Sequence, residues 1–242
     1  MKEKEALKIA IIGGGAAGFF AALAAKEANS EAEVAIYEKS AKLLSKVRIS
    51  GGGRCNVTHA CFDPHLLVQN YPRGHQELLG PFHRFQPRNT IEWFAQRGVE
   101  LHTERDGRMF PTTNSSQTII DCLLGEAKKL GVEIHTRVKA IPTNVDRLIL
   151  ATGSSPEGWE WAKERGHTIQ PPVPSLFTLN IPHFALADLA GIAVHTHLRI
   201  DRLESSGPLL ITHWGFSGPA ALKLSAFGAR YLAEKQYKVP LY

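Results

Sequence analysis

Cysteine is scarce in this chain, and its spacing excludes two common kinds of site. Only three cysteines, Cys55, Cys61 and Cys122, occur in 242 residues, and none belongs to a C-x-x-C pair. An odd and scattered set predicts neither a disulfide framework nor a zinc site. No Ser-His-Asp arrangement and no metal-ligand spacing stands out either. The sequence therefore predicts no metal and leaves the catalytic residues unknown.

Long hydrophobic runs are also missing. The first apolar run, Ile9–Ile12, is too short for the core of a signal peptide, and no run reaches membrane-spanning length. Internal repeats and low-complexity segments are absent as well. We therefore predict a cytoplasmic protein that has no membrane partner and folds around a sizeable core.

The charge is basic without being concentrated in one place. Lys and Arg number 28 against 23 acidic residues, which gives a formal net charge of +5. The cations are scattered, and aromatic residues do not alternate with them as in single-strand binders. These features argue against nucleic acid as a partner without excluding it, and the oligomeric state stays unknown.

A glycine-rich segment follows the first apolar run. Residues 13–18 read Gly-Gly-Gly-Ala-Ala-Gly, and an alanine-rich stretch, 16–28, predicts a helix that begins inside the loop. Gly13, Gly15 and Gly18 stand at the G-x-G-x-x-G spacing, which allows a tight turn, close approach to a pyrophosphate and close helix packing. The phosphates are expected at the positive end of that helix.

An acidic residue stands where this pattern needs one. Val34–Glu38 predicts a second strand, and Glu38 lies about twenty residues past the last glycine, where a carboxylate binds ribose hydroxyls. A 2′-phosphate would be repelled there, so the pattern favours FAD or NAD over NADP. There is no second G-x-G-x-x-G, so no dedicated NAD(P)H domain is predicted.

The second glycine-rich segment, residues 50–58, reads Ser-Gly-Gly-Gly-Arg-Cys-Asn-Val-Thr. Three consecutive glycines expose backbone N–H groups to a ligand without side-chain obstruction. Arg54 and Asn56 add donors suited to phosphate or to flavin carbonyl oxygens. Cys55 is either a redox-active thiol near a flavin or a small residue packed at the loop, and the lack of a close cysteine partner favours packing.

These motifs resemble the HI0933-like family of bacterial FAD-dependent flavoproteins, also called YhiN- or BaiN-like. The stretch Ile49–Asn56 is the specific element, and Asp106–Pro111, Leu148–Gly153, Pro171–Leu176 and Gly207–Pro219 are similar to further family segments. The resemblance covers nearly the whole chain from Lys8.

The resemblance implies an extended FAD, with its pyrophosphate at the first glycine loop, its ribose at Glu38 and its adenine at the backbone of Val138. It also implies a longer chain, so we expect this sequence to be incomplete, ending inside an inserted domain and short between Val138 and Asp146. The implied cofactor-binding residues are Gly13, Gly15, Ala16, Ala17, Gly18, Glu38, Lys39, Lys46, Ser50, Gly52, Gly53, Arg54, Cys55, Asn56, Val138, Ala151, Thr152 and Gly153.

Prolines divide the predicted fold. Pro171, Pro172 and Pro174 interrupt the α/β pattern. We predict an α/β fold with a Rossmann-like, FAD-binding parallel sheet in residues 1–170. A β-rich inserted domain, the expected substrate domain, follows in residues 171–242.

The predicted function is FAD-dependent oxidoreduction, with hydride passing between flavin and a small organic acceptor. The resemblance suggests reduction of an unsaturated carbonyl compound, with NAD(P)H as a transient donor. Two alternatives stay open: a flavin-bearing, RNA-modifying protein that uses Lys223 and Arg230 of a predicted helix over 218–230, and a non-catalytic dinucleotide-binding scaffold.

Overall fold

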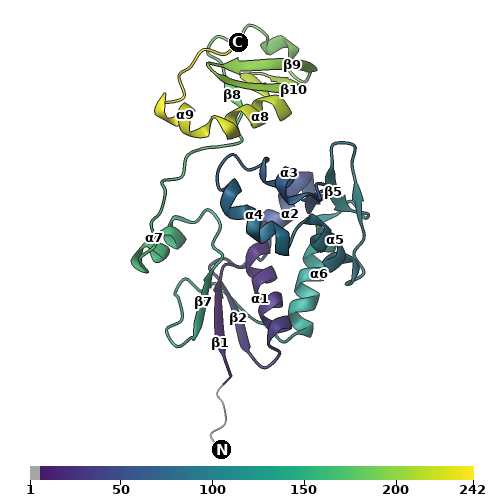
Figure 1. Ribbon diagram of the computed structural model, residues 1–242, viewed down its shortest axis with the longest axis vertical. Coiled ribbons are helices and arrows are strands. Elements are labelled where there is room, and N and C mark those ends of the chain that lie inside the picture. Colours follow the sequence, from purple (N-terminus) through teal and green to yellow (C-terminus); the bar gives the residue numbers. More distant parts are fainter. Residues whose placement is uncertain (1–5) are drawn as a thin grey trace, which may run out of the picture. The chain divides into compact units, whose positions relative to one another are not determined.

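The computed structural model describes residues 6–242, which divide into two compact units, 6–169 and 170–242. The first unit is built on a parallel sheet of four strands in the order β6-β2-β1-β7 (Figure 1). Its strands are β1 (Lys8–Ile12), β2 (Glu33–Glu38), β6 (Glu133–Thr136) and β7 (Arg147–Leu150). The predicted α/β fold with a parallel sheet is confirmed.

Apolar side chains explain why β1 lies in the middle of this sheet. Ile11 is fully buried and pairs with Ile36 on one side and Ile149 on the other. Helix α1 (Ala16–Ala28) covers the sheet with Phe19 and Leu23, both fully buried. Because all four strands run in the same direction, the loops after β1, β2 and β7 meet at one edge of the sheet.

The remaining elements of the first unit surround this sheet. Helix α6 packs against α1, and a small antiparallel sheet has the order β3-β5-β4. Segment 137–146 holds no helix or strand. The elements are α2 (Ser45–Ile49), the short turn η1 (Ser50–Gly53), β3 (Thr58–His59), α3 (Pro64–Val68), α4 (His75–Arg84), α5 (Pro87–Ala95), β4 (Leu101–Thr103), β5 (Arg108–Pro111), α6 (Ser116–Lys129) and α7 (Pro156–Glu164).

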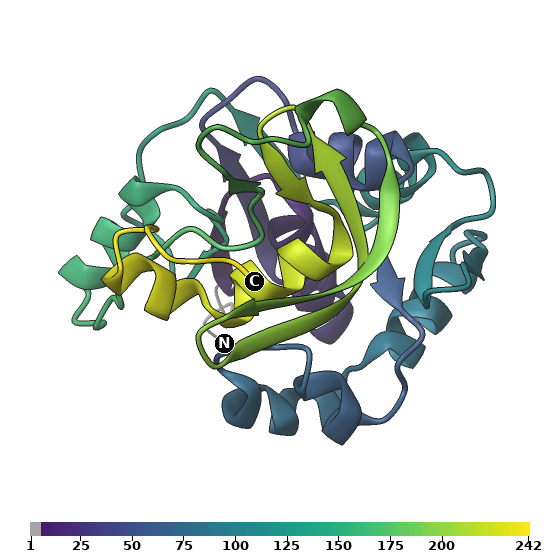
Figure 2. The same ribbon diagram turned by 90° about the horizontal axis from the view of Figure 1, so that it is seen from above.

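The second unit is an antiparallel sheet with helices on one face. Its strand order is β8-β11-β10-β9, and Figure 2 shows the long, twisted strands in light green with helix α8 beside them. Leu198, Leu209 and Leu224 belong to the core between sheet and helix. The elements are β8 (Leu179–Asn180), the turn η2 (Ala187–Leu189), β9 (Ala193–Ile200), β10 (Leu203–Thr212), β11 (Gly215–Ser217), α8 (Gly218–Phe227) and α9 (Ala229–Glu234).

Two details of this unit differ from, or add to, the sequence prediction. The predicted helix over 218–230 is interrupted, because Gly228 ends α8 and α9 begins at the next residue. Glycine is a poor helix former and a common terminator. In addition, Tyr242 and Arg199 exchange two backbone hydrogen bonds, of 2.9 and 2.7 Å, so the last residue lies beside β9.

Candidate functional site: a glycine turn at the edge of the parallel sheet

Two glycines of the first loop are required by the packing of the protein itself. Gly13 has φ +117°, and a Cβ there would collide with the carbonyl oxygen of Ala151, just after β7. A Cβ on Gly18 would collide with the carbonyl oxygen of Gly13. The turn is therefore pressed between α1 and the end of β7, and both positions exclude larger residues.

Gly15 differs from its neighbours because the protein places nothing near it. A Cβ on Gly15 would meet no heavy atom within 4 Å. Gly15 is also the N-cap of α1, with no side-chain cap and no acidic residue in the first turn, and Ala16 and Ala17 are exposed. An uncapped helix start with open space in front is suited to an anion such as a pyrophosphate, so the residues present fit a dinucleotide.

The carboxylate of Glu38 lies beside this turn. Its Oε2 accepts a hydrogen bond from the Gly14 N–H and its Oε1 from the Ser40 N–H, both at 2.8 Å. Burial acts to raise the pKa of Glu38, but these hydrogen bonds, together with the Ser40 hydroxyl and the Lys39 charge, outweigh burial and hold the pKa below its ordinary value. Glu38 is thus ionised and fixed, as an acceptor for ribose hydroxyls must be.

The lowered pKa leads to a prediction about stability. A group with a depressed pKa in the folded state stabilises the fold above its unfolded pKa and loses that contribution as the pH falls through the folded value. We expect Glu38→Gln to lower the free energy of unfolding by about 1–2 kcal/mol at pH 7. This difference from wild type should shrink progressively as the pH falls below the ordinary glutamate pKa. Urea unfolding across this range measures the difference.

The control for this prediction is Glu33→Gln, the same change at an exposed position of the same strand. It should leave the unfolding free energy within about 0.5 kcal/mol of wild type. A Glu38→Gln effect that is the same at every pH would show that the charge of Glu38 does not stabilise the fold.

The second glycine loop also combines a packed glycine with open ones. Gly51, Gly52 and Gly53 have φ of +56°, +69° and +86°. A Cβ on Gly51 would lie 2.8 Å from Cε1 of Phe110, whereas a Cβ on Gly52 would meet nothing within 4 Å. Asn56 has an amide orientation in which its nitrogen donates to the carbonyl oxygens of Thr58 (3.0 Å) and Met109 (3.3 Å). The loop thus keeps an open, backbone-lined surface at Gly52.

A cavity of about 470 Å³ opens between α1, this loop, α5 and α6. Its size is that of a typical small-molecule site. Six of the residues singled out from the sequence line it, among them the first two residues of α1. These six are Ala16, Ala17, Lys46, Ser50, Cys55 and Asn56.

Lys46 connects this cavity to the segment after β7. Its ammonium donates to the Ser154 hydroxyl at 3.0 Å and would lie 3.6 Å from a Cβ on Gly153. Ala151 is tied to β1 by a bond from its N–H to the Ile12 carbonyl, and Thr152 packs against Gly158 of α7. The structure therefore brings residues 151–153 and Lys46 together at the sheet edge.

Other predicted residues have side chains or backbone groups engaged elsewhere. Lys39 forms an ion pair with Glu157 at 2.9 Å, and the hydrogen bond and charge of Lys39 lower the pKa of Glu157. The Val138 N–H donates to the Glu38 carbonyl at 3.0 Å, which leaves the carbonyl of Val138 for any contact with adenine. Arg54 is not among the cavity-lining residues and is bound to Glu104 at 2.6 Å.

The thiol of Cys55 is buried, and burial raises its pKa although Ser50 opposes the shift through a hydrogen bond. A raised pKa keeps the thiol protonated and unreactive. Cys55 has φ +63° and is free, as are Cys61 and Cys122. These properties favour the interpretation of Cys55 as a packed loop residue.

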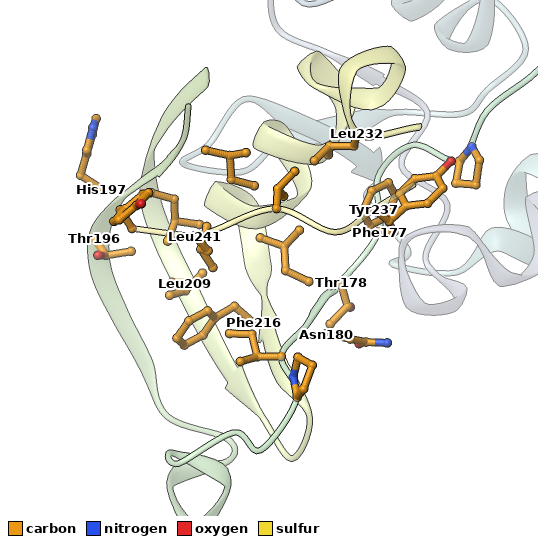
Figure 3. Close-up of a pocket in the computed structure, with 18 residues that line it drawn as sticks. Phe177, Thr178, Asn180, Thr196, His197, Leu209, Phe216, Leu232, Tyr237 and Leu241 are labelled. Carbon is orange, nitrogen blue, oxygen red and sulfur yellow. The ribbon is translucent and has the colours of Figure 1, made fainter. Parts of the chain in front are cut away.

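A second cavity, of about 730 Å³, lies within the second unit between the sheet and the C-terminal segment. Phe177, Leu209, Phe216 and Leu241 turn toward it, whereas the imidazole of His197 points away (Figure 3). It is larger than the first cavity, but none of the residues predicted to bind the cofactor lines it, whereas six of them line the first cavity. The first cavity is therefore the candidate for the nucleotide site.

Comparison with known proteins identifies the family. The model of the HI0933-like protein Rossmann domain matches residues 7–150, more than half of the chain. The chain belongs to the HI0933-like family. The family predicted from the sequence is thus confirmed, and the model of the HI0933-like protein barrel and H2TH domain matches residues 173–242.

Curated relatives of this HI0933-like chain carry two kinds of name. A 3-dehydro-bile acid delta(4,6)-reductase from Clostridium scindens is 30% identical over 264 residues, covering 96% of this chain and 63% of that protein. Ribosomal RNA dihydrouridine synthases from Escherichia coli and Haemophilus influenzae are each 30% identical, covering 90% of this chain and 60% of each of those proteins. The chain thus spans about three fifths of the length of these relatives.

Sequence reasoning missed the aromatic wall of the first cavity in this HI0933-like chain. Phe20 of α1 contacts Phe85 with ring centroids 5.4 Å apart and Trp93 at 4.9 Å, and Phe94 completes the wall. The apolar spacing on α5 predicts a buried helix face. That spacing does not reveal which element the face packs against, because the contact joins residues more than sixty positions apart.

Two classes of feature are absent from the described part of the chain. Within residues 6–242, no three His, Cys, Asp or Glu side chains gather closely enough to hold a metal ion. Over the same residues, no helix combines the length and apolarity needed to cross a membrane.

Proposed function

We propose that this HI0933-like chain carries the FAD site of a flavin-dependent reductase that acts on a carbon–carbon double bond conjugated to a carbonyl group. The observation that carries the proposal is the open position at Gly15, at the uncapped start of α1 and next to the fixed carboxylate of Glu38. The protein's own packing requires Gly13 and Gly18, but it gives no reason for a glycine at Gly15. A bound pyrophosphate does give one.

The residues of the site have separate roles in this proposal. The N–H groups of Ala16 and Ala17 bind the pyrophosphate, Glu38 accepts the ribose hydroxyls, and Lys46 and the backbone at Gly52 and Gly53 line the path toward the cavity. Phe20, Phe85 and Phe94 exclude water from the cavity. When bound, FAD supplies hydride transfer.

The curated relatives support the class of substrate. A delta(4,6)-reductase of a 3-dehydro steroid reduces double bonds conjugated to a ketone, and dihydrouridine is uridine whose conjugated double bond has been reduced. Both named reactions therefore add hydrogen to an unsaturated carbonyl compound. The first candidate substrate is therefore an apolar ring compound that carries a conjugated ketone. The mostly apolar cavity of the second unit, the domain expected to bind the substrate, suits such a compound.

RNA is the second candidate substrate, favoured by the two dihydrouridine synthase relatives. Lys223 on α8 is exposed, and Arg230 on α9 donates to the Pro171 carbonyl at 2.6 Å. Electrostatic binding of RNA by this basic chain would weaken steeply as salt is raised.

The test begins with FAD uptake, followed by visible absorption under anaerobic conditions. We expect the protein to bind FAD. We also expect added NADH or NADPH to bleach the absorption band of the bound flavin. A cyclic enone should then restore the band, whereas free FAD treated in the same way should not respond to the enone. If RNA restores the band and gains dihydrouridine, the second candidate replaces the first. Failure to bind added FAD would overturn both.

A further inference from the structure

Arg54 stands in the second glycine loop with its side chain held by the neighbouring β4–β5 hairpin. Its Nη1 donates to Glu104 Oε1 at 2.6 Å, and its guanidinium carbon lies 4.0 Å from the ring centre of Phe110. The Arg54 and Glu104 side chains are 35% and 27% exposed, so the ion pair is partly shielded from water. A charged hydrogen bond that is shielded in this way is stronger than one on the open surface.

The hairpin that holds Arg54 is itself well anchored. Phe110 on β5 is fully buried, and its ring packs against the backbone of Gly51. Glu104 uses its other oxygen to bind Arg108 at 2.9 Å, and Arg108 in turn binds Asp106 at 2.7 Å. Arg54 therefore links the three consecutive glycines, whose backbone has weak conformational preferences, to the buried ring of Phe110.

The glycine loop needs such an anchor because its own conformational preferences are weak. Glycine loses more freedom on ordering than any other residue, and here three in succession adopt positive φ. Within the loop, the Cys55 N–H donates to the Ser50 carbonyl at 2.9 Å. The link from Arg54 to Glu104 and Phe110 adds a fixed point immediately after the third glycine.

We propose that Arg54 and Glu104 are positioning residues: Glu104 and Phe110 hold the Arg54 side chain, and Arg54 thereby holds the Gly51–Gly53 backbone in the conformation that receives the nucleotide. This inference rests on the proposed FAD site, and it changes the role expected of Arg54 from the sequence. The guanidinium binds Glu104 and Phe110 of the protein, and the backbone of the loop binds the nucleotide.

The first measurement is hydrogen exchange of the amides of residues 51–56 in the FAD-free protein. We expect Arg54→Gln and Glu104→Gln each to speed exchange there about tenfold, and the double variant to be no faster than the faster single variant, because both changes break one link. The matched control is Asp106→Asn, which removes the other carboxylate partner of Arg108 but leaves the link intact. It should leave exchange at residues 51–56 unchanged.

The second measurement is the dissociation constant for FAD of the same four variants. Each link-breaking variant should bind FAD roughly tenfold more weakly, because a loosened loop must be ordered on binding, and Asp106→Asn should match wild type. The inference is overturned if Arg54→Gln weakens FAD binding without faster exchange, since Arg54 would then contact FAD directly. It is also overturned if Glu104→Gln changes neither quantity. Wild-type protein that takes up no FAD would contradict the proposed function, and hydrogen exchange would still decide the role of the link.

Discussion

Replacement of Gly15 by aspartate is expected to abolish FAD binding while leaving the FAD-free protein at least as stable as wild type. Gly15 has φ −92° and ψ −175°, an extended conformation that aspartate adopts readily, and no protein atom stands in the way of its side chain. Aspartate is among the best N-cap residues, and its charge faces the positive end of α1. The same charge and volume would occupy the place proposed for the pyrophosphate.

The expected magnitudes have opposite signs in the two measurements. The better cap and the helix dipole should raise the free energy of unfolding by up to about 1 kcal/mol, or roughly 2–4 °C in Tm. The affinity for FAD should fall at least about hundredfold, because the carboxylate would repel the pyrophosphate and would itself accept from the N–H groups at the start of α1. Thermal unfolding and titration with FAD measure the two effects.

Gly15→Asn is the matched control for this prediction. Asparagine caps a helix about as well as aspartate and has nearly the same size, but it carries no charge. It should therefore share the gain in stability and lose less affinity than Gly15→Asp. If Gly15→Asp still bound FAD as tightly as wild type, the pyrophosphate could not lie at the start of α1, and the proposed site would have to be abandoned.

Gly18→Ala, three residues further along the same loop, is expected to destabilise the first unit by about 3 kcal/mol or more. The added methyl group would be forced against the carbonyl oxygen of Gly13, a residue whose N–H is bound to the Tyr37 carbonyl at 2.8 Å. Neither atom belongs to a flexible side chain, so α1 would have to move away from β1. Circular dichroism during heating should show Tm lowered by roughly 6–12 °C.

Gly125→Ala provides a control in which the same substitution has the opposite effect. Gly125 lies inside α6, is exposed, and a Cβ there would meet nothing within 4 Å. Alanine in a helix interior is favoured over glycine, so this variant should gain about 0.5–1 kcal/mol. Equal stability of the Gly18 and Gly125 variants would mean that α1 does not press on the glycine turn as described.

The parts of the site that the sequence predicts well are those determined by neighbours along the chain. The turn at Gly13 and Gly18, the start of α1 and the position of Glu38 all follow from spacing within one βαβ unit, because a strand, a tight turn and a helix leave few arrangements open. The division of roles among the glycines is different. The sequence shows that Gly13, Gly15 and Gly18 fit one pattern, but only the contacts separate the packed positions from the open one.

Side-chain partnerships across the fold could not be predicted from the sequence. The donors of Arg54 indicated a ligand contact, whereas the structure pairs the residue with Glu104, fifty positions away. The pairing depends on where the β4–β5 hairpin packs against the glycine loop. The local sequence of the loop or of the hairpin does not predict that position by itself. The same holds for Phe20. Its position in the helix predicts that it faces the core, but does not predict that Phe85 and Trp93 are the residues it contacts.

The pairing of Tyr242 with Arg199 has a practical consequence for handling this protein. Since the two residues exchange both backbone hydrogen bonds, His197 and His195 present their backbone groups toward the same side of β9 as Arg199 does. Any residues that follow Tyr242, a purification tag included, would therefore start on the edge of a sheet, where they can pair with β9 as a fifth strand or pull Tyr242 away from it.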